Sequence, residues 1–263
     1  MKKVLLATAA LVFVSATPGL AADLPVKAPP MPAPVFTWTG FYVGGNGGWG
    51  EGRSQSTAFL GDTAFPTGTV FNEISSSGWL AGAQVGFNYQ TAYNLVVGVE
   101  GEWDWTNISG TETTLSTHAI AGAPVGSAST TTGRIKDLAD LTGRIGWAAG
   151  PWLFYGKGGV ALDQTSSSSV FLSTTGTLVS TSASSGTFDR SGWVVGAGFE
   201  WAFAPGWSAK IEYEHFDFGS TPIGITHVTA GVLSQTFVSS TEKIDVVKGG
   251  INWRFNWGAP ATY

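Results

Sequence analysis

The chain has 263 residues, no cysteine, a formal net charge of −5 and only 12% charged residues, about half the share found in ordinary soluble domains. The absence of cysteine excludes disulfide frameworks, thiolate zinc sites and cysteine nucleophiles. The acidic balance argues against a nucleic-acid partner, and the lack of an 18-residue apolar run beyond the extreme N-terminus excludes a bundle of membrane helices.

The first 38 residues predict an export signal followed by a linker. Lys2 and Lys3 precede a mostly apolar stretch at residues 4–14, and the small residues Gly19 and Ala21 predict cleavage after Ala21. Residues 1–21 are therefore expected to be a secretory signal peptide. Residues 22–38 contain five prolines among alanines, a composition that favours an extended periplasmic linker.

From Thr39 onward the chain repeats one unit, a segment of about eleven residues that alternates in polarity with period two. The predicted strands are residues 39–50, 79–89, 95–106, 138–149, 152–163, 192–203, 207–218 and 243–255. Short connections lie at residues 90–94, 150–151 and 204–206, and long Ser/Thr/Gly-rich connections at residues 51–78, 107–137, 164–191 and 219–242. Within the long connections, residues 170–172 and 225–237 are candidates to extend the strands as hairpins.

Short turns at one rim and long loops at the other are typical of an outer-membrane barrel with both termini in the periplasm. The predicted fold is all-β, an eight-stranded antiparallel transmembrane β-barrel over residues 39–255 with a C-terminal tail at residues 256–263. Ten to twelve residues per strand match a tilted crossing of the bilayer.

Each strand yields two sets of alternate residues. Around Ala197, for example, one set is bulky and apolar, whereas the other consists of glycines, a valine and Glu200. A soluble ligand-binding barrel would show the same alternation with the apolar set inside. Three observations favour the apolar set facing lipid: an eight-stranded barrel has little interior room, the low charge could not solvate its outside, and tryptophans gather at strand ends. The expected girdles are Trp49, Trp79, Trp103, Trp105 and Trp193 near the long loops, and Trp38, Trp147, Trp152, Trp201, Trp207, Trp253 and Trp257 near the short turns.

The inward set collects seven acids and five bases, namely Glu100, Glu102, Asp104, Asp140, Glu200, Glu212 and Glu214 with Arg144, Lys157, Lys210, Lys248 and Arg254. We expect these charges to pair across the lumen and to plug it. An ion or solute pathway is the alternative interpretation.

Other chemical motifs carry little information. Residues 45–50 match GxGxxG, but no helix follows that could hold a phosphate. The three histidines, His118, His215 and His227, lack a zinc arrangement, and no GxSxG elbow is present. A lipid-modifying enzyme could use His215 or Asp217 near the outer rim, but we predict no enzyme activity, no cofactor and no metal.

The last strand carries a more specific signal. Lys248, Gly250, Trp253 and Phe255 follow a polar, glycine, aromatic, aromatic pattern that resembles the sorting signal read by the bacterial barrel assembly machinery. The chain continues for eight residues beyond the final aromatic residue of this pattern, whereas such barrels usually stop there.

Residues 21–29 (AADLPVKAP), the Pro-rich linker, residues 36–45 (FTWTGFYVGG) and the aromatic closing strand resemble the outer-membrane immunogenic protein and porin-like family of alphaproteobacteria, with an OmpA-type barrel. The resemblance implies an abundant surface-exposed barrel with roles in envelope integrity and antigenicity, and it implies no catalytic or cofactor residue. We therefore expect a structural and surface-presentation role in the bacterial outer membrane, with a porin-like channel as the alternative. The expected partners are outer-membrane lipid and lipopolysaccharide, the assembly machinery during biogenesis, and host factors or phage at the loops, with no nucleic acid.

Overall fold

The computed structural model describes residues 36–60, 70–115, 128–172, 178–185, 190–229 and 232–255, all within one unit, Phe36–Tyr263. The predicted signal peptide, most of the linker and the tail at residues 256–263 lie outside the described residues. Among the described residues, no helix is long and apolar enough to span a membrane.

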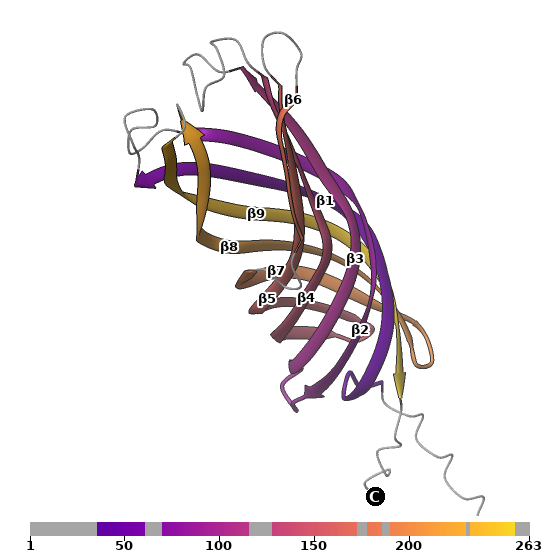
Figure 1. Cartoon of the computed structure of the whole chain (residues 1–263). Coiled ribbons are helices and arrows are strands. Elements are labelled where there is room, and N and C mark those ends of the chain that lie inside the picture. Colours follow the sequence, from indigo (N-terminus) through magenta and orange to yellow (C-terminus); the bar gives the residue numbers. More distant parts are fainter. Residues whose placement is uncertain are drawn as a thin grey trace, which may run out of the picture. The chain divides into compact units, whose positions relative to one another are not determined.

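The described chain forms nine antiparallel strands (Figure 1). They are β1 (Gly40–Leu60), β2 (Val70–Gln90), β3 (Leu95–Leu115), β4 (Ala128–Ala149), β5 (Trp152–Leu172), β6 (Leu178–Ser185), β7 (Arg190–Ala204), β8 (Trp207–Thr229) and β9 (Val232–Phe255). Eight of them close into a ring in the order β1-β2-β3-β4-β5-β7-β8-β9, with β9 paired back onto β1. The predicted eight-stranded barrel is confirmed.

The remaining strand, β6, adds to the outer end of the wall without widening the ring. It pairs with β5 from Ser166 outward, whereas β7 pairs with the same strand as far as Asp163. In the described part of the chain, β6 thus continues the line of β7 along β5.

All three predicted short connections are tight turns. Asn94, Gly150 and Gly206 have φ values of 62°, 60° and 78°, the left-handed conformation that glycine and asparagine tolerate best. These turns lie at the same end of the ring as the start of β1 and the end of β9, because Phe41 pairs with Phe255.

At the other end, the strands extend well beyond their predicted limits. The register of β8 and β9 continues to the pair Thr229–Val232, and that of β4 and β5 to the pair Ala128–Leu172. The extensions expected at residues 170–172 and 225–237 are therefore confirmed, except at residues 230–231, which lie outside the described residues. Polar Ser/Thr segments resemble loops in the sequence, but backbone ladder hydrogen bonds do not require apolar side chains.

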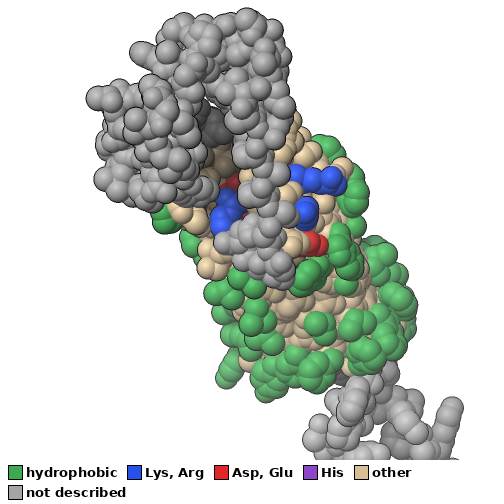
Figure 2. Space-filling view, viewed as in Figure 1, with side chains coloured by type: hydrophobic (Ala, Val, Ile, Leu, Met, Phe, Trp, Pro, Cys, Tyr) green, Lys and Arg blue, Asp and Glu red, His purple; other side chains and the backbone are tan. Residues whose placement is uncertain are grey.

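The outside of the ring carries two tryptophan rings with an apolar band between them. Trp49, Trp79, Trp103, Trp105 and Trp193 form the outer tryptophan ring, and Trp147, Trp152, Trp201, Trp207 and Trp253 form the inner tryptophan ring; all are exposed. Figure 2 shows, on the face in view, hydrophobic side chains gathered over one part of the described surface and charged side chains beyond it.

The assignment of Trp38 to the inner girdle is wrong, and Trp257 lies outside the described residues. Trp38 is only 1% exposed and packs inside the short-turn end against Val96, Ala148, Leu153 and Tyr155. We call these five side chains the basal cluster. The indole Nε1–H of Trp38 donates to the Gly150 carbonyl (3.2 Å), and its backbone N–H donates to Gln90 Oε1 (2.8 Å).

The polarity of the two faces inverts near the outer tryptophan ring. At that level, the interior holds an apolar layer of Leu80, Ile108, Ile135, Leu138, Ala161, Val194, Phe216, Phe218, Ile244 and Val246. The outward positions of the same strands carry charges instead, among them Glu51, Arg53 and Lys243, which are exposed. Such a section, polar outside and apolar inside, has the pattern of a barrel surrounded by water.

Candidate functional site

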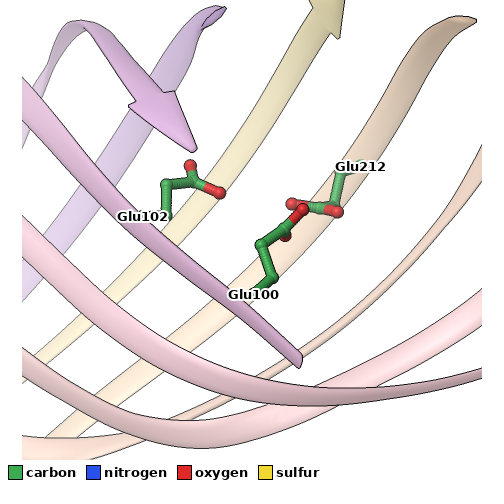
Figure 3. Close-up of side chains that lie close together, drawn as sticks. All are labelled: Glu100, Glu102 and Glu212. Carbon is green, nitrogen blue, oxygen red and sulfur yellow. The ribbon is translucent and has the colours of Figure 1, made fainter. Parts of the chain in front are cut away.

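The central lumen, between the basal cluster and the apolar layer, contains buried charged side chains from six strands. β3 supplies Glu100, Glu102 and Asp104, β8 supplies Lys210, Glu212 and Glu214, and β4, β5, β7 and β9 supply Arg144, Lys157, Glu200 and Lys248 respectively. We call these ten residues the ionic layer. In Figure 3, Glu100 and Glu102 from β3 and Glu212 from β8 direct their carboxylates into the same space.

Three ammonium groups separate these carboxylates. Lys157 Nζ lies 3.1 Å from both Glu100 Oε1 and Glu212 Oε1, and Lys210 Nζ lies 3.5 and 3.4 Å from the same two atoms. Lys248 contacts Glu102 and Glu214 and lies 3.3 Å from Asp104. Each lysine therefore bridges several acids, which is how a barrel can bury like charges side by side.

Arg144 joins the ionic layer to the basal cluster. Its Nη2 donates to Glu200 Oε2 at 2.9 Å, and its Nη1 donates to the Tyr42 hydroxyl at 3.0 Å. The guanidinium also lies 4.2 Å from the centroid of the Tyr155 ring. Tyr42 and Tyr155 in turn donate hydrogen bonds to Glu100 and Glu212, at 2.8 and 2.6 Å. These contacts link strands on opposite sides of the ring.

Glycines on the inward faces provide the room for these side chains. A Cβ added to Gly82 would collide with the Asp104 carboxylate, and one added to Gly86 would collide with the Tyr42 hydroxyl. By contrast, a Cβ on the outward-facing Gly47 would meet no atom closer than 3.6 Å. The glycine content of β1 and β2 is thus partly explained by the volume of the lumen side chains.

Two of the twelve predicted lumen charges lie apart from this set of ion pairs. Asp140 makes no ion pair among the described residues, and its buried Oδ1 has no hydrogen-bond partner. Arg254 lies over the rings of Phe36 and Trp38, with 4.8 Å from its Cζ to each centroid, and it makes no ion pair within the described residues.

The ionic layer is poorly suited to hold a metal ion. Carboxylate oxygens of Glu100, Glu102 and Glu212, and of Glu102, Asp140 and Glu214, lie within 4.8 Å of one another. However, Lys157 and Lys248 already contact both Glu102 and Glu214. A cation placed between those acids would lie beside two ammonium groups.

The structure also describes the candidate enzyme residues His215 and Asp217 and the residues of the predicted sorting signal. His215 Nδ1 lies 2.7 Å from Asp245 Oδ1, next to Trp193, on the outside of the wall, and Asp217 lies 3.3 Å from Lys243 Nζ. In the closing strand, Lys248 points into the ionic layer, whereas Trp253 is exposed and packs on Phe255 with ring centroids 4.3 Å apart.

The basal cluster and the apolar layer were missed by the sequence analysis. The parity of β1 was the available signal for Trp38: odd positions such as Phe41 and Val43 face outward, so an even position before them belongs inside. For the apolar layer, the signal was the alternation of Phe216 and Phe218 with Asp217, which reverses the pattern of the preceding residues.

A family model described as the outer membrane protein beta-barrel domain matches residues 7–255. The chain belongs to this family. The 31 kDa outer-membrane immunogenic protein of Brucella melitensis is 30% identical over 97% of this chain and 100% of its own length. The 25 kDa outer-membrane immunogenic protein of Brucella abortus is 26% identical over 84% of this chain and 86% of its own. These relatives confirm the predicted family and the location in the bacterial outer membrane.

Among solved structures, the outer membrane protease OmpT of Escherichia coli aligns with a TM-score of 0.52 and 9% identity, covering 85% of this chain and 99% of that one. At that identity the likeness shows the fold alone.

The spacing of the tryptophan rings agrees with a barrel that spans the membrane. The eight-residue step from Trp193 to Trp201 is about 26 Å along the strand, which is about 20 Å along the barrel axis at a tilt near 40°. This height is close to the ~25 Å apolar band of such barrels.

Proposed function

We propose that this protein is a closed structural barrel of the outer membrane that presents extended strand ends and loops at the cell surface. The observation that carries the proposal is the filling of the lumen at three successive levels by the basal cluster, the ionic layer and the apolar layer. An eight-stranded barrel has little more interior volume than its own side chains require. Water and solutes would have to displace all three levels to pass.

The apolar layer is the strongest argument against the channel alternative. Ions cross a narrow apolar constriction only after it has been wetted, which is how hydrophobic gates block conduction. Ile108 and Ile244 are 0% exposed and Phe216 is 1% exposed. The burial of these side chains supports a lumen that is closed to water above the ionic layer.

Planar-bilayer recording tests the closed barrel directly. We expect purified wild-type protein to give no stable conductance steps, while a large porin inserted in parallel gives them. A large, stable, solute-permeable conductance from the wild-type barrel would overturn the proposal and favour the channel.

Surface presentation requires the long-loop end of the barrel to lie outside the cell. We propose this orientation, with both termini in the periplasm. Since the chain contains no cysteine, single cysteines can report it. On intact cells, an impermeant maleimide should label Thr111→Cys, which is exposed beyond the outer tryptophan ring, but not Tyr93→Cys in a short turn, whose side chain is 89% exposed. Labelling of Tyr93→Cys alone would reverse the orientation.

The partners follow from that orientation. We propose that lipopolysaccharide surrounds the outer tryptophan ring, that host factors or phage contact the loops, and that the assembly machinery reads Lys248, Gly250, Trp253 and Phe255. The exposed position of Trp253 and its packing on Phe255, with ring centroids 4.3 Å apart, support an aromatic outer face that the machinery can read.

A further inference from the structure

Arg254 is a cation enclosed at the short-turn end of the lumen. It lies on β9 opposite Tyr42 of β1, its residue is 5% exposed, and its backbone N–H donates to the Gly206 carbonyl at 2.7 Å. The neighbouring Trp253 belongs to the inner tryptophan ring. The guanidinium therefore lies near the depth at which lipid headgroups begin.

No counter-ion for Arg254 is found among the described residues. Its Nε is buried without a hydrogen-bond partner, and none of the ion pairs of the described chain includes its guanidinium. Glu200 is engaged elsewhere, because it accepts hydrogen bonds from Arg144 at 2.9 Å, from Asn252 at 2.9 Å and from Ser208.

Two aromatic rings are the closest described partners of the Arg254 guanidinium. Phe36 and Trp38 lie against the guanidinium at 4.8 Å each, and cation–π contact compensates only part of the cost of burying a charge. The N–H groups of a guanidinium lie in its own plane, where they can donate to two oxygens of a phosphate or carboxylate. A buried charge of this kind is normally paired.

We propose that Arg254, framed by Phe36 and Trp38, binds a phosphate group at the short-turn mouth of the barrel. The depth of Trp253 favours the headgroup of a phospholipid as the source, and free phosphate is the second source of the same chemistry. The site differs from the ionic layer, whose cations are all paired. Its test does not depend on the orientation proposed above, since binding can be measured in detergent.

Titration of the full chain in a phosphate-free maltoside detergent tests the site. We expect short-chain phosphatidylglycerol to bind saturably to the wild type with one site per barrel, and Arg254→Gln to bind at least tenfold more weakly. Arg134→Gln, at the opposite end of the barrel, should bind like the wild type. Inorganic phosphate is titrated in parallel: equal binding identifies free phosphate as the source, whereas binding of lipid alone identifies the headgroup. Absence of saturable binding to the wild type, or wild-type binding by Arg254→Gln, overturns the proposal.

Thermal unfolding separates a binding role from a merely structural one. Without phosphate, removal of an unpaired buried charge should give Arg254→Gln a higher thermal midpoint than the wild type. Saturating ligand should then raise the midpoint of the wild type but not that of the variant, because only the folded wild type binds it. Equal lowering of the midpoint by Arg254→Gln with and without ligand would assign Arg254 to aromatic packing alone and overturn the proposal. A heat-dependent mobility shift checks that both proteins are folded.

Discussion

Lys157 contacts four carboxylates inside the barrel, those of Glu100, Glu102, Glu212 and Glu214. Ion pairs of this kind contribute little net stability compared with an apolar core, but the loss of one member leaves the other charges uncompensated. The ionic layer is therefore sensitive to single substitutions, even though its total contribution to stability is small.

Replacing Lys157 with methionine should lower the free energy of unfolding by about 3–5 kcal/mol. The reason is that four buried acids lose a shared cation. Lys243→Met is the matched control, because the Lys243 side chain is 52% exposed and its one ion pair among the described residues is with Asp217, so its loss should cost less than about 1 kcal/mol. Urea unfolding of the barrel in lipid vesicles, followed by tryptophan fluorescence, measures both. Equal effects of the two variants would contradict the burial of the ionic layer.

A second matched pair consists of one glycine that faces the lumen, Gly82, and one that faces the outside of the barrel, Gly47. Gly82→Ala should destabilise the barrel by about 1–3 kcal/mol, because its Cβ would overpack the lumen against Asp104. Gly47→Ala, which faces outward with its nearest neighbour at 3.6 Å, should be neutral or stabilising by up to about 1 kcal/mol. The same unfolding assay compares them, and a larger loss from Gly47→Ala would be inconsistent with the assigned faces.

At the residue scale, period-two alternation was sufficient to predict which side chains face the lumen, but not which of the lumen charges form ion pairs. The charge-bearing positions of β3 and β8 follow directly from the alternation. Which acid meets which base depends on the register between strands that are far apart in sequence, such as Lys248 of β9 and Glu102 of β3. The absence of ion pairs at Asp140 and Arg254 within the described part of the chain could not be predicted for the same reason.

Within an element, the inversion of polarity defines where each strand leaves the lipid. On β7, Ala197 lies midway between Trp193 and Trp201, whereas Ser191 lies beyond the outer tryptophan ring on the same face. The same face of β7 therefore meets lipid at Ala197 and water at Ser191.

Ala197→Arg should destabilise the inserted barrel by about 2–4 kcal/mol, because a cation near the bilayer midplane is poorly solvated. Ser191→Arg should change stability by no more than about 1 kcal/mol. Unfolding from phospholipid vesicles gives both values, and equal tolerance at the two positions would refute the lipid-facing assignment.

Beyond the outer tryptophan ring, Glu242 of β9 and Asp163 of β5 share Arg190, at 3.1 and 2.9 Å. Burial raises the pKa of Glu242 above its usual value, and Arg190 offsets only part of this effect. The folded protein therefore holds the Glu242 proton more tightly than the unfolded chain does.

This difference predicts a pH dependence. Stability from Glu242 is fully present below its unfolded pKa near 4.3 and is lost as the pH rises through the higher folded pKa. Glu242→Gln should remove that decline, so the difference in free energy of unfolding between variant and wild type should shift in favour of the variant as pH rises from 4 to about 7. A difference that does not change over this interval would contradict the raised pKa.

At the element scale, the sequence predicted the membrane-crossing parts of the strands well and their outer ends poorly. Between the two tryptophan rings, lipid requires an apolar residue at every second position, so the pattern is strong. Beyond the tryptophan rings, water can solvate Ser and Thr side chains, so the alternation in polarity is weak. Residues 107–115 of β3 and 219–229 of β8 therefore resembled loops.

For the whole molecule, closure of β9 on β1 removes every exposed edge from the spanning section. We expect the folded protein to resist SDS at room temperature and to migrate differently after boiling. Deletion of residues 243–255 should abolish this heat-dependent shift, since an open sheet in lipid leaves backbone groups unpaired. A shift that persists in the deletion variant would show that closure is not required.

In the orientation proposed above, the extension of β8 and β9 has a consequence for recognition from outside the cell. Beyond the irregularity that follows Asp217, their paired backbones continue for ten residues from Ser220 to Thr229, which corresponds to about 30 Å of strand. A binding protein as wide as an antibody domain could then dock at this tip while remaining clear of the bilayer. Sequence changes there would alter the epitope without touching the parts that fold and anchor the barrel.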